Sequence, residues 1–150
     1  MTDKERKEHL KRRLHRYRDL EAERRQIALE LEKVEDFMNG PRGANLDGMP
    51  KAPGIGDPVL GVVSQHLALQ ERYRLQLEKL AAAQATIEDM IERLEPMARQ
   101  LMRYRYIDGL PWEEVCVAIR YSWRQTHNIH AKALDALLAA ELEKETGANV

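Results

Sequence analysis

The chain has 150 residues and a formal net charge of −1, which leaves room for one compact domain or a small domain joined to an extended helical element. Charged residues make up 33% of the chain and hydrophobic residues 43%, with only one Phe and two Trp. This composition predicts an all-α protein of long amphipathic helices and excludes two domains with large cores. Because the total charge does not attract nucleic acid, any DNA binding must use a local basic patch.

The cysteine content and the hydropathy pattern bear on the compartment. Cys116 is the only cysteine, which excludes an internal disulfide and a cysteine-cluster zinc site. No apolar run approaches the roughly 20 residues that span a bilayer, and residues 1–18 are charged throughout, unlike a secretory signal. We therefore expect a cytoplasmic protein with no membrane partner.

The residues expected of an enzyme are missing from the sequence. It has no Gly-rich phosphate loop and no nucleophile accompanied by a base. His127 and His130 lie three residues apart, but no third ligand accompanies them at a spacing that suits a metal ion. We expect no enzymatic activity, no catalytic residues, no cofactor and no metal.

Two long helices are expected within residues 1–95, one over residues 4–38 and one over residues 59–95. At 1.5 Å per residue they are about 52 and 55 Å long, so they match in length. Between them, residues 39–58 hold five Gly and four Pro, a composition typical of a loop or flexible linker. The simplest arrangement is a long antiparallel helical hairpin resembling a coiled coil, although pairing between two copies of the chain would satisfy the same apolar faces.

Apolar residues recur at spacings of three and four along both expected helices, as in a coiled coil. In the first helix Arg24 interrupts a seam formed by Tyr17, Leu20, Ile27, Leu31, Val34 and Met38. In the second helix the predicted seam runs through Val59, Val63, His66, Gln70, Tyr73, Leu77, Leu80, Gln84, Ile87, Ile91 and Leu94. We expect the polar members, His66, Gln70 and Gln84, to help set the register or the choice of partner.

A separate C-terminal domain is expected over residues 96–142, followed by a frayed tail over residues 143–150. Pro96 disfavours helical geometry at the preceding residue and so predicts a kink or a new helix start. Three helical segments follow, over residues 96–107, 112–119 and 123–142. A small core is expected from Leu101, Tyr106, Trp112, Val115 and Ile119, with Cys116 as an inert packing thiol.

The last two of these segments, joined by a three-residue turn, are typical of a helix-turn-helix. Ser122 is placed to cap the second segment. With Thr126 turned inward, a rotation of about 100° per residue places Ile129, Ala133 and Leu137 on the inner face and Arg124, Asn128 and Ala131 on the outer face. Arg, Gln and Asn suit bidentate contacts with base edges. The expected DNA-binding residues are Ser122, Trp123, Arg124, Gln125, His127, Asn128 and Lys132.

Three stretches carry a family resemblance: RYIDGLPWEEV at residues 105–115, Tyr121-Ser122, and HAKAL at residues 130–134. They resemble region four of sigma-70-type factors and, more closely, phage and prophage transcriptional regulators of the RinA and ArpU type. The stretch LDGMP at residues 46–50, followed by Asp57, is also similar to the linker of those regulators. The resemblance covers about residues 38–138.

This resemblance implies a sequence-specific regulator of late or packaging genes in a bacterial host cell. It implies double-stranded DNA as the partner. Because no sigma-like promoter-melting region is recognisable, the chain is expected to act either through RNA polymerase holoenzyme as a second partner or as a DNA-bound adaptor. A homo-oligomer is expected, with a dimer favoured. The chain departs from the family at Arg120, where the turn usually has Gly, at Pro111, where Ser or Thr is common, and at Thr126, where an aliphatic residue is usual. A left-handed Arg120 would cost roughly 1–2 kcal/mol.

Further hypotheses concern a basic stretch near the N-terminus, Arg105 and Trp123. Residues 4–18 hold eight Lys or Arg against two Glu. Either this is a solvated helix face, or Lys11, Arg12, Arg13 and Arg16 contact DNA phosphates beside the helix-turn-helix. Arg105 is expected to pair with Glu113 or Glu114 and so lock two helices together. Trp123 is expected either to stack on DNA or to pack on the preceding helix.

Two alternative functions stay open at the level of the sequence. One is a DNA-packaging component such as a small terminase subunit, which also combines helix-turn-helix units with helical oligomerisation elements. The other is a protein-interaction module that keeps the helix-turn-helix fold without using it on DNA.

Overall fold

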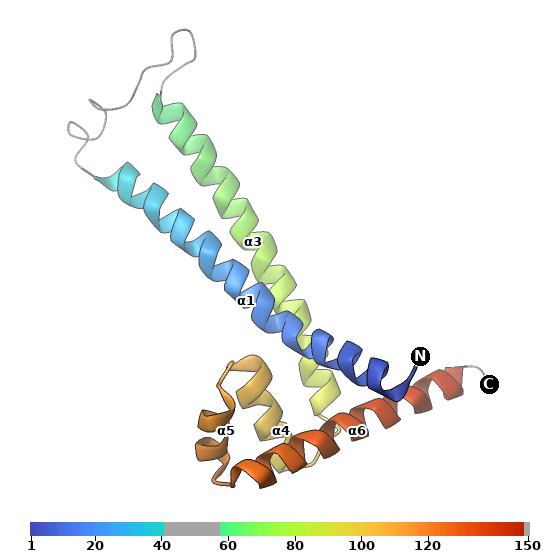
Figure 1. Cartoon of the computed structure of the whole chain (residues 1–150). Coiled ribbons are helices and arrows are strands. Elements are labelled where there is room, and N and C mark those ends of the chain that lie inside the picture. Colours follow the sequence, from blue (N-terminus) through green and yellow to red (C-terminus); the bar gives the residue numbers. More distant parts are fainter. Residues whose placement is uncertain (41–57, 149–150) are drawn as a thin grey trace. The chain divides into compact units, whose positions relative to one another are not determined.

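A computed structural model describes residues 1–40 and 58–148, and this part of the chain is entirely helical, with no strand. The elements in chain order are α1 (Asp3–Asn39), α3 (Pro58–Ile91), α4 (Pro96–Met102), the π-helix η1 (Arg103–Ile107), α5 (Trp112–Ile119) and α6 (Trp123–Ala148) (Figure 1). The prediction of an all-α protein is confirmed. The Gly/Pro-rich linker and the LDGMP stretch fall almost entirely outside the described residues.

The helix ends follow local chemistry. Pro96 stands at the first position of α4, where its missing N–H costs nothing, and Glu95 before it is extended, with φ −62° and ψ 154°. The predicted new helix start at Pro96 is therefore confirmed, and α3 ends four residues short of the predicted residue 95. At the other end, α6 continues to Ala148, so residues 143–148 are helical where a frayed tail was expected.

The chain forms two compact units, and their boundary falls inside the two long helices. Unit 1 comprises Met1–Asp19 and Ala81–Val150, and unit 2 comprises Leu20–Leu80. The sequence placed the helix-turn-helix domain at residues 96–142, whereas the contacts add the first nineteen residues and residues 81–95 to the same unit. Each unit is described by itself below.

The core of unit 1 draws on every helix of the unit. Its buried members are Leu10, Leu14, Ile87, Ile91, Leu94, Leu101, Met102, Tyr106, Val115, Ile119, Ala133, Leu134 and Leu137. Of the five core residues predicted from the C-terminal segment, four are buried and Trp112 is half-buried. Leu10 and Leu14 are also fully buried, although they lie in a basic stretch and were not among the predicted core residues. They lie four residues apart on one face of α1, so α1 supplies a hydrophobic edge to the core of unit 1.

In unit 2, α1 and α3 lie side by side and run antiparallel (Figure 1). Near one end, the Gln76 amide donates to the carbonyl of Leu20 at 2.9 Å and to Glu23 Oε2 at 3.1 Å. Near the other, His66 Nε2 lies 3.2 Å from Glu35 Oε1. The contacts therefore pair increasing residue numbers on α1 with decreasing numbers on α3.

On α3, every second residue of the observed seam lies one position before the residue that was predicted there. Leu69, Gln76 and Leu80 are buried, whereas the predicted seam members Gln70, Leu77 and Gln84 are exposed. The predicted and the observed seam share His66, Tyr73 and Leu80, and both alternate spacings of three and four residues. Periodicity alone therefore does not distinguish one seam from the other. The buried polar residue is consequently Gln76. Its amide is satisfied by the Leu20 carbonyl, which is the condition for burying it at little cost.

Replacing Gln76 by Ala removes a buried hydrogen-bond donor and opens space in the seam, so we expect the free energy of unfolding to fall by roughly 1–3 kcal/mol. The matched control is Gln65→Ala on an exposed face of the same helix, for which a change within about 0.5 kcal/mol is expected. Urea unfolding followed by circular dichroism measures both. Equal effects of the two substitutions would refute the register described here.

Candidate functional site

The turn between α5 and α6 is closed by a residue in the left-handed conformation. Arg120 has φ 62° and ψ 39°, and it is the only described non-glycine residue with positive φ. Its N–H donates to the Val117 carbonyl at 3.3 Å, and the N–H of Tyr121 donates to the Cys116 carbonyl at 3.2 Å. This pair of bonds is the Schellman arrangement, which usually has Gly at the left-handed position. The turn predicted over residues 120–122 is therefore made with Arg in place of Gly.

A reciprocal pair of hydrogen bonds fixes the start of α6. The Ser122 hydroxyl accepts from the N–H of Gln125 at 3.2 Å, and Gln125 Oε1 accepts from the N–H of Ser122 at 3.1 Å. The predicted cap by Ser122 is thus half of a capping box. Because the Gln125 carboxamide oxygen already accepts one hydrogen bond, the orientation of this side chain is tied to the helix start. This weakens its candidacy for a bidentate contact with a base.

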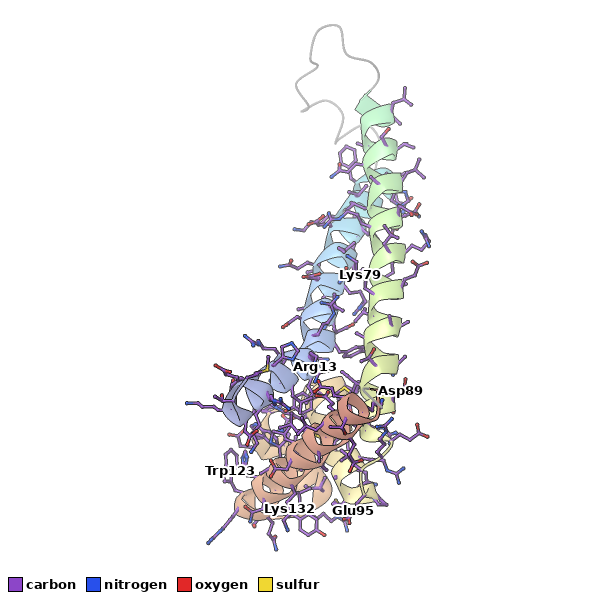
Figure 2. The ribbon with its side chains drawn as sticks, turned by 90° about the vertical axis from the view of Figure 1, so that its right-hand side faces the viewer. Arg13, Lys79, Asp89, Glu95, Trp123 and Lys132 are labelled. Carbon is purple, nitrogen blue, oxygen red and sulfur yellow. The ribbon has the colours of Figure 1, made fainter. Side chains whose placement is uncertain are left out.

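The faces of α6 follow the predicted rotation. Thr126, Ala133 and Leu137 are buried, Ile129 of the predicted inner face is half-buried against the core, and the Thr126 hydroxyl donates to the Ser122 carbonyl at 2.8 Å. Exposed positions on this helix include Arg124, Asn128 and Lys132, the last labelled in Figure 2. Of the predicted DNA-binding residues, Ser122, Trp123, Arg124, Gln125, Asn128 and Lys132 are exposed, and His127 is half-buried. The residues suited to base contacts are therefore free of the protein's own packing.

His127 is held between two indole rings. Its ring centroid lies 4.6 Å from that of Trp112 on α5 and 4.4 Å from that of Trp123, one turn back on α6. Its Nε2 is buried without a hydrogen-bond partner in the protein. Trp123 therefore packs on its own helix and stays 53% exposed, rather than covering α5 directly. The cluster stiffens the first two turns of α6 and leaves half of one indole free.

Below this cluster, Tyr106 of η1 and His130 of α6 share a hydrogen bond of 2.7 Å between Oη and Nε2. Burial lowers the pKa of His130 to about 4, with nearby cations such as Lys11 acting in the same direction. Burial also raises the pKa of Tyr106 to about 12. At neutral pH the bond therefore joins a neutral imidazole to a neutral phenol, and it connects η1 to the middle of α6.

Two arginines fasten the loop that precedes α5. Arg18 Nη1 donates to the Ile107 carbonyl at 3.1 Å, and its guanidinium lies against Gly109, whose φ of +72° favours glycine. Arg105 Nη1 donates to the Leu110 carbonyl at 3.1 Å, and its guanidinium lies 4.8 Å from the centroid of Trp112. The expected ion pair of Arg105 with Glu113 or Glu114 is wrong, because the guanidinium is occupied by this carbonyl and ring. Both carboxylates are exposed in the first turn of α5.

The four basic residues proposed for phosphate contact have different surroundings. Arg12 and Arg16 are exposed on α1, on the side opposite the buried Leu10 and Leu14. Lys11 is half-buried, with its Nζ 3.7 Å from Glu8 Oε1. Arg13, labelled in Figure 2, pairs with Glu141 of α6. The pair lowers the availability of Arg13 for DNA.

A cation that the sequence did not single out lies closer to the outer face of α6. Lys7 Nζ is 2.9 Å from Asp135 Oδ1, and Asp135 lies seven residues after Asn128, on the same face. The one carboxylate on this part of the face is thereby neutralised. The only sequence signal was the placement of Leu10 one turn after Lys7, which shows the side of α1 that packs.

Metal and membrane features can be stated for the described residues. No group of three or more His, Cys, Asp or Glu is placed to hold a metal ion within residues 1–40 and 58–148. In the same part of the chain, no helix is both long and apolar enough to cross a membrane.

No family model matches the chain, and neither a curated protein nor a solved structure shows significant similarity to it.

The left-handed turn yields a prediction about stability. Arg120→Gly removes the steric cost of a Cβ atom at φ 62°, so we expect the free energy of unfolding to rise by about 1 kcal/mol. Arg120→Ala removes the same charged side chain but keeps the Cβ atom, so its stability should match that of the wild type. Chemical unfolding of the three proteins measures this, and a destabilised glycine variant would contradict the turn geometry.

The buried imidazole predicts a pH dependence. Because the pKa of His130 is about 4 in the folded chain and about 6.5 in the unfolded chain, the unfolded state takes up the proton first. The stability that comes from keeping His130 neutral is therefore complete above pH 6.5 and is lost as the pH falls towards 4. From this group alone, the free energy of unfolding should fall by about 2 kcal/mol between pH 7 and pH 5. His130→Gln should remove this contribution, leaving the smaller one of His15, whose pKa burial also lowers, whereas His9→Gln on the exposed side of α1 should leave both in place. Unfolding curves at both pH values give the measurement.

Proposed function

We propose that this chain is a sequence-specific DNA-binding transcriptional regulator of the phage and prophage RinA and ArpU type. In this proposal a sigma-region-four-like helix-turn-helix follows a long antiparallel helical hairpin. The observation that carries it is the outer face of α6, where Arg124 and Asn128 are exposed directly after a start fixed by Ser122. A helix of this kind, entered from its N-terminal end, is the element that reads the major groove.

Arg124 and Asn128 have distinct roles in this proposal. Arg donates two parallel hydrogen bonds to guanine, and Asn both donates to and accepts from adenine. The two residues are four apart, so they lie one turn apart on the same face. Each good bidentate contact is worth roughly 1–3 kcal/mol of discrimination against other bases. Gln125 holds the helix start, and its free amide N–H groups suit a phosphate or a single base contact.

The flanks of α6 supply the phosphate contacts. Lys132 is exposed on one side, and Lys11 approaches His130 from α1, while Lys7 is engaged in neutralising Asp135. Arg12 and Arg16 remain candidates only where the duplex passes the outer side of α1. Because Arg13 is paired with Glu141, it stabilises the contact of α1 with α6 rather than DNA. Cations around the recognition helix provide the local basic patch that a chain of net charge −1 needs.

The proposed biological setting follows from the resemblance rather than from the geometry. The chain would act in the bacterial cytoplasm on late or packaging genes. As it lacks a recognisable promoter-melting region, it would work through an existing RNA polymerase holoenzyme or as a DNA-bound adaptor.

A second candidate function is a protein-interaction module. Val117 on α5 is 78% exposed, and Tyr121 in the turn is 39% exposed, so an apolar surface lies next to the recognition helix. Exposed apolar side chains gathered at one place favour a protein contact. In a regulator this surface suits the polymerase, and in a pure interaction module it suits another protein with no DNA involved.

Selection of bound sequences from a random DNA pool tests the proposal, followed by affinity measurements on the selected site at a stated salt concentration. We expect Arg124→Ala and Asn128→Ala each to weaken specific binding by roughly 5- to 150-fold and to leave non-specific binding nearly unchanged. The matched control is Arg93→Ala, which removes an exposed arginine of the same unit at the C-terminal side of α3.

The outcomes separate the candidate functions. Equal affinity of the wild type for selected and random DNA would refute sequence-specific regulation. Absence of any DNA binding at low salt would favour the interaction module instead. A Gln125→Ala variant should mainly lower stability, by about 1 kcal/mol for half of a capping box.

A further inference from the structure

Unit 2 exposes a second line of apolar side chains on α3. Leu60, Leu67 and Leu77 are 64%, 59% and 43% exposed. We use the name α3 stripe for the residues on this face that follow one another at spacings of three and four: Leu60, Val63, Leu67, Gln70, Arg74 and Leu77. The spacing is that of a helix packing against another helix over several turns.

The α3 stripe is separate from the seam that packs on α1. Its members Leu67, Gln70 and Leu77 directly follow His66, Leu69 and Gln76 of the seam, so they are turned by about 100° from it. Helix α3 therefore has two neighbouring faces for packing, as helices do in bundles of more than two. The exposed side of α1 in this unit, by contrast, has Leu29 as its one large exposed apolar residue.

We infer that the α3 stripe is the contact surface for a second copy of this chain, with the two α3 helices antiparallel. The sequence of the stripe is self-complementary about Arg72. Leu67 and Leu77 lie five residues to either side of it, and Gln70 and Arg74 lie two residues to either side. A twofold axis at this point places Leu67 of one copy against Leu77 of the other, and Gln70 against Arg74. A twofold contact of this kind uses the same patch on both copies.

The charges of the stripe favour this direction. Arg74 is held by Glu71 at 2.7 Å and by Glu78 at 2.6 Å, so its charge is already matched within its own helix. A parallel pairing would bring Arg74 against Arg74 of the second copy, whereas the antiparallel pairing places the amide oxygen of Gln70 within its reach. The occupant that fits the central part of the stripe, residues 67–77, is therefore α3 itself. This inference does not depend on DNA binding.

The molar mass of the full chain in solution, measured by light scattering, is the first test. We expect the wild type at about twice 17.4 kDa and the double variant Leu67→Gln, Leu77→Gln at about 17.4 kDa, with unchanged helicity by circular dichroism. The matched control is Leu29→Gln, which replaces a leucine of similar exposure on α1 and should stay dimeric. A monomeric wild type would overturn the inference and leave residues 41–57 or another protein as the occupant. A ring-sized oligomer would overturn it in favour of a packaging component.

Cysteine cross-linking tests the direction of pairing independently of stability. In a Cys116→Ser background, Leu67→Cys together with Leu77→Cys should give a disulfide-linked dimer under mild oxidation, because the two positions face each other. Leu67→Cys alone should not, since its two copies lie ten residues apart, or about 15 Å along the helix, beyond the reach of a disulfide. Cross-linking by Leu67→Cys alone would overturn the antiparallel arrangement. Retained dimerisation of Leu67→Gln, Leu77→Gln would overturn the stripe as the interface.

Discussion

The burial of one face of α6 against the core of unit 1 is the constraint on which the rest of the proposed interface depends. A helix turns by about 100° per residue, so placing Thr126, Ala133 and Leu137 in the core leaves Arg124 and Asn128 no direction except outward. The start of the helix is then held from both sides, by the left-handed Arg120 and by the reciprocal bonds of Ser122 and Gln125. The backbone of so fixed a helix does not have to be ordered when a ligand binds, which removes part of the entropic cost of binding.

Unit 1 depends on the N-terminal part of α1 because two of its other helices, α4 and α5, are short. Helix α4 has seven residues and α5 has eight, and helices of this length are marginal without tertiary packing. Leu10 and Leu14 of α1 close the core from one side, and Arg18 and Arg13 fasten the same helix to the loop before α5 and to α6. The N-terminal segment thus has a structural role in unit 1.

The features predicted correctly are those decided by a few neighbouring residues. The bounds of α5, the new helix at Pro96, the cap by Ser122 and the outward direction of Arg124 all follow from local turn chemistry or helix rotation. The errors concern partners distant in sequence. Arg105 was assigned a carboxylate of α5 but bonds to the Leu110 carbonyl and lies over Trp112, because the loop folds back underneath it. Gln70 was placed in the seam in place of Gln76, because both choices obey the same spacing.

What the sequence determined by itself is the all-helical architecture, the position of the turn at residues 120–122 and the two faces of α6, since these rest on periodicity and on residues at most a few positions apart. Only the tertiary structure decided that Leu10 and Leu14 enter the core, that Gln76 rather than Gln70 is buried, and that His127 lies between Trp112 and Trp123. These depend on which of several equivalent faces meets another helix. A linear pattern lists the faces that are available, and only the packing of distant segments selects among them.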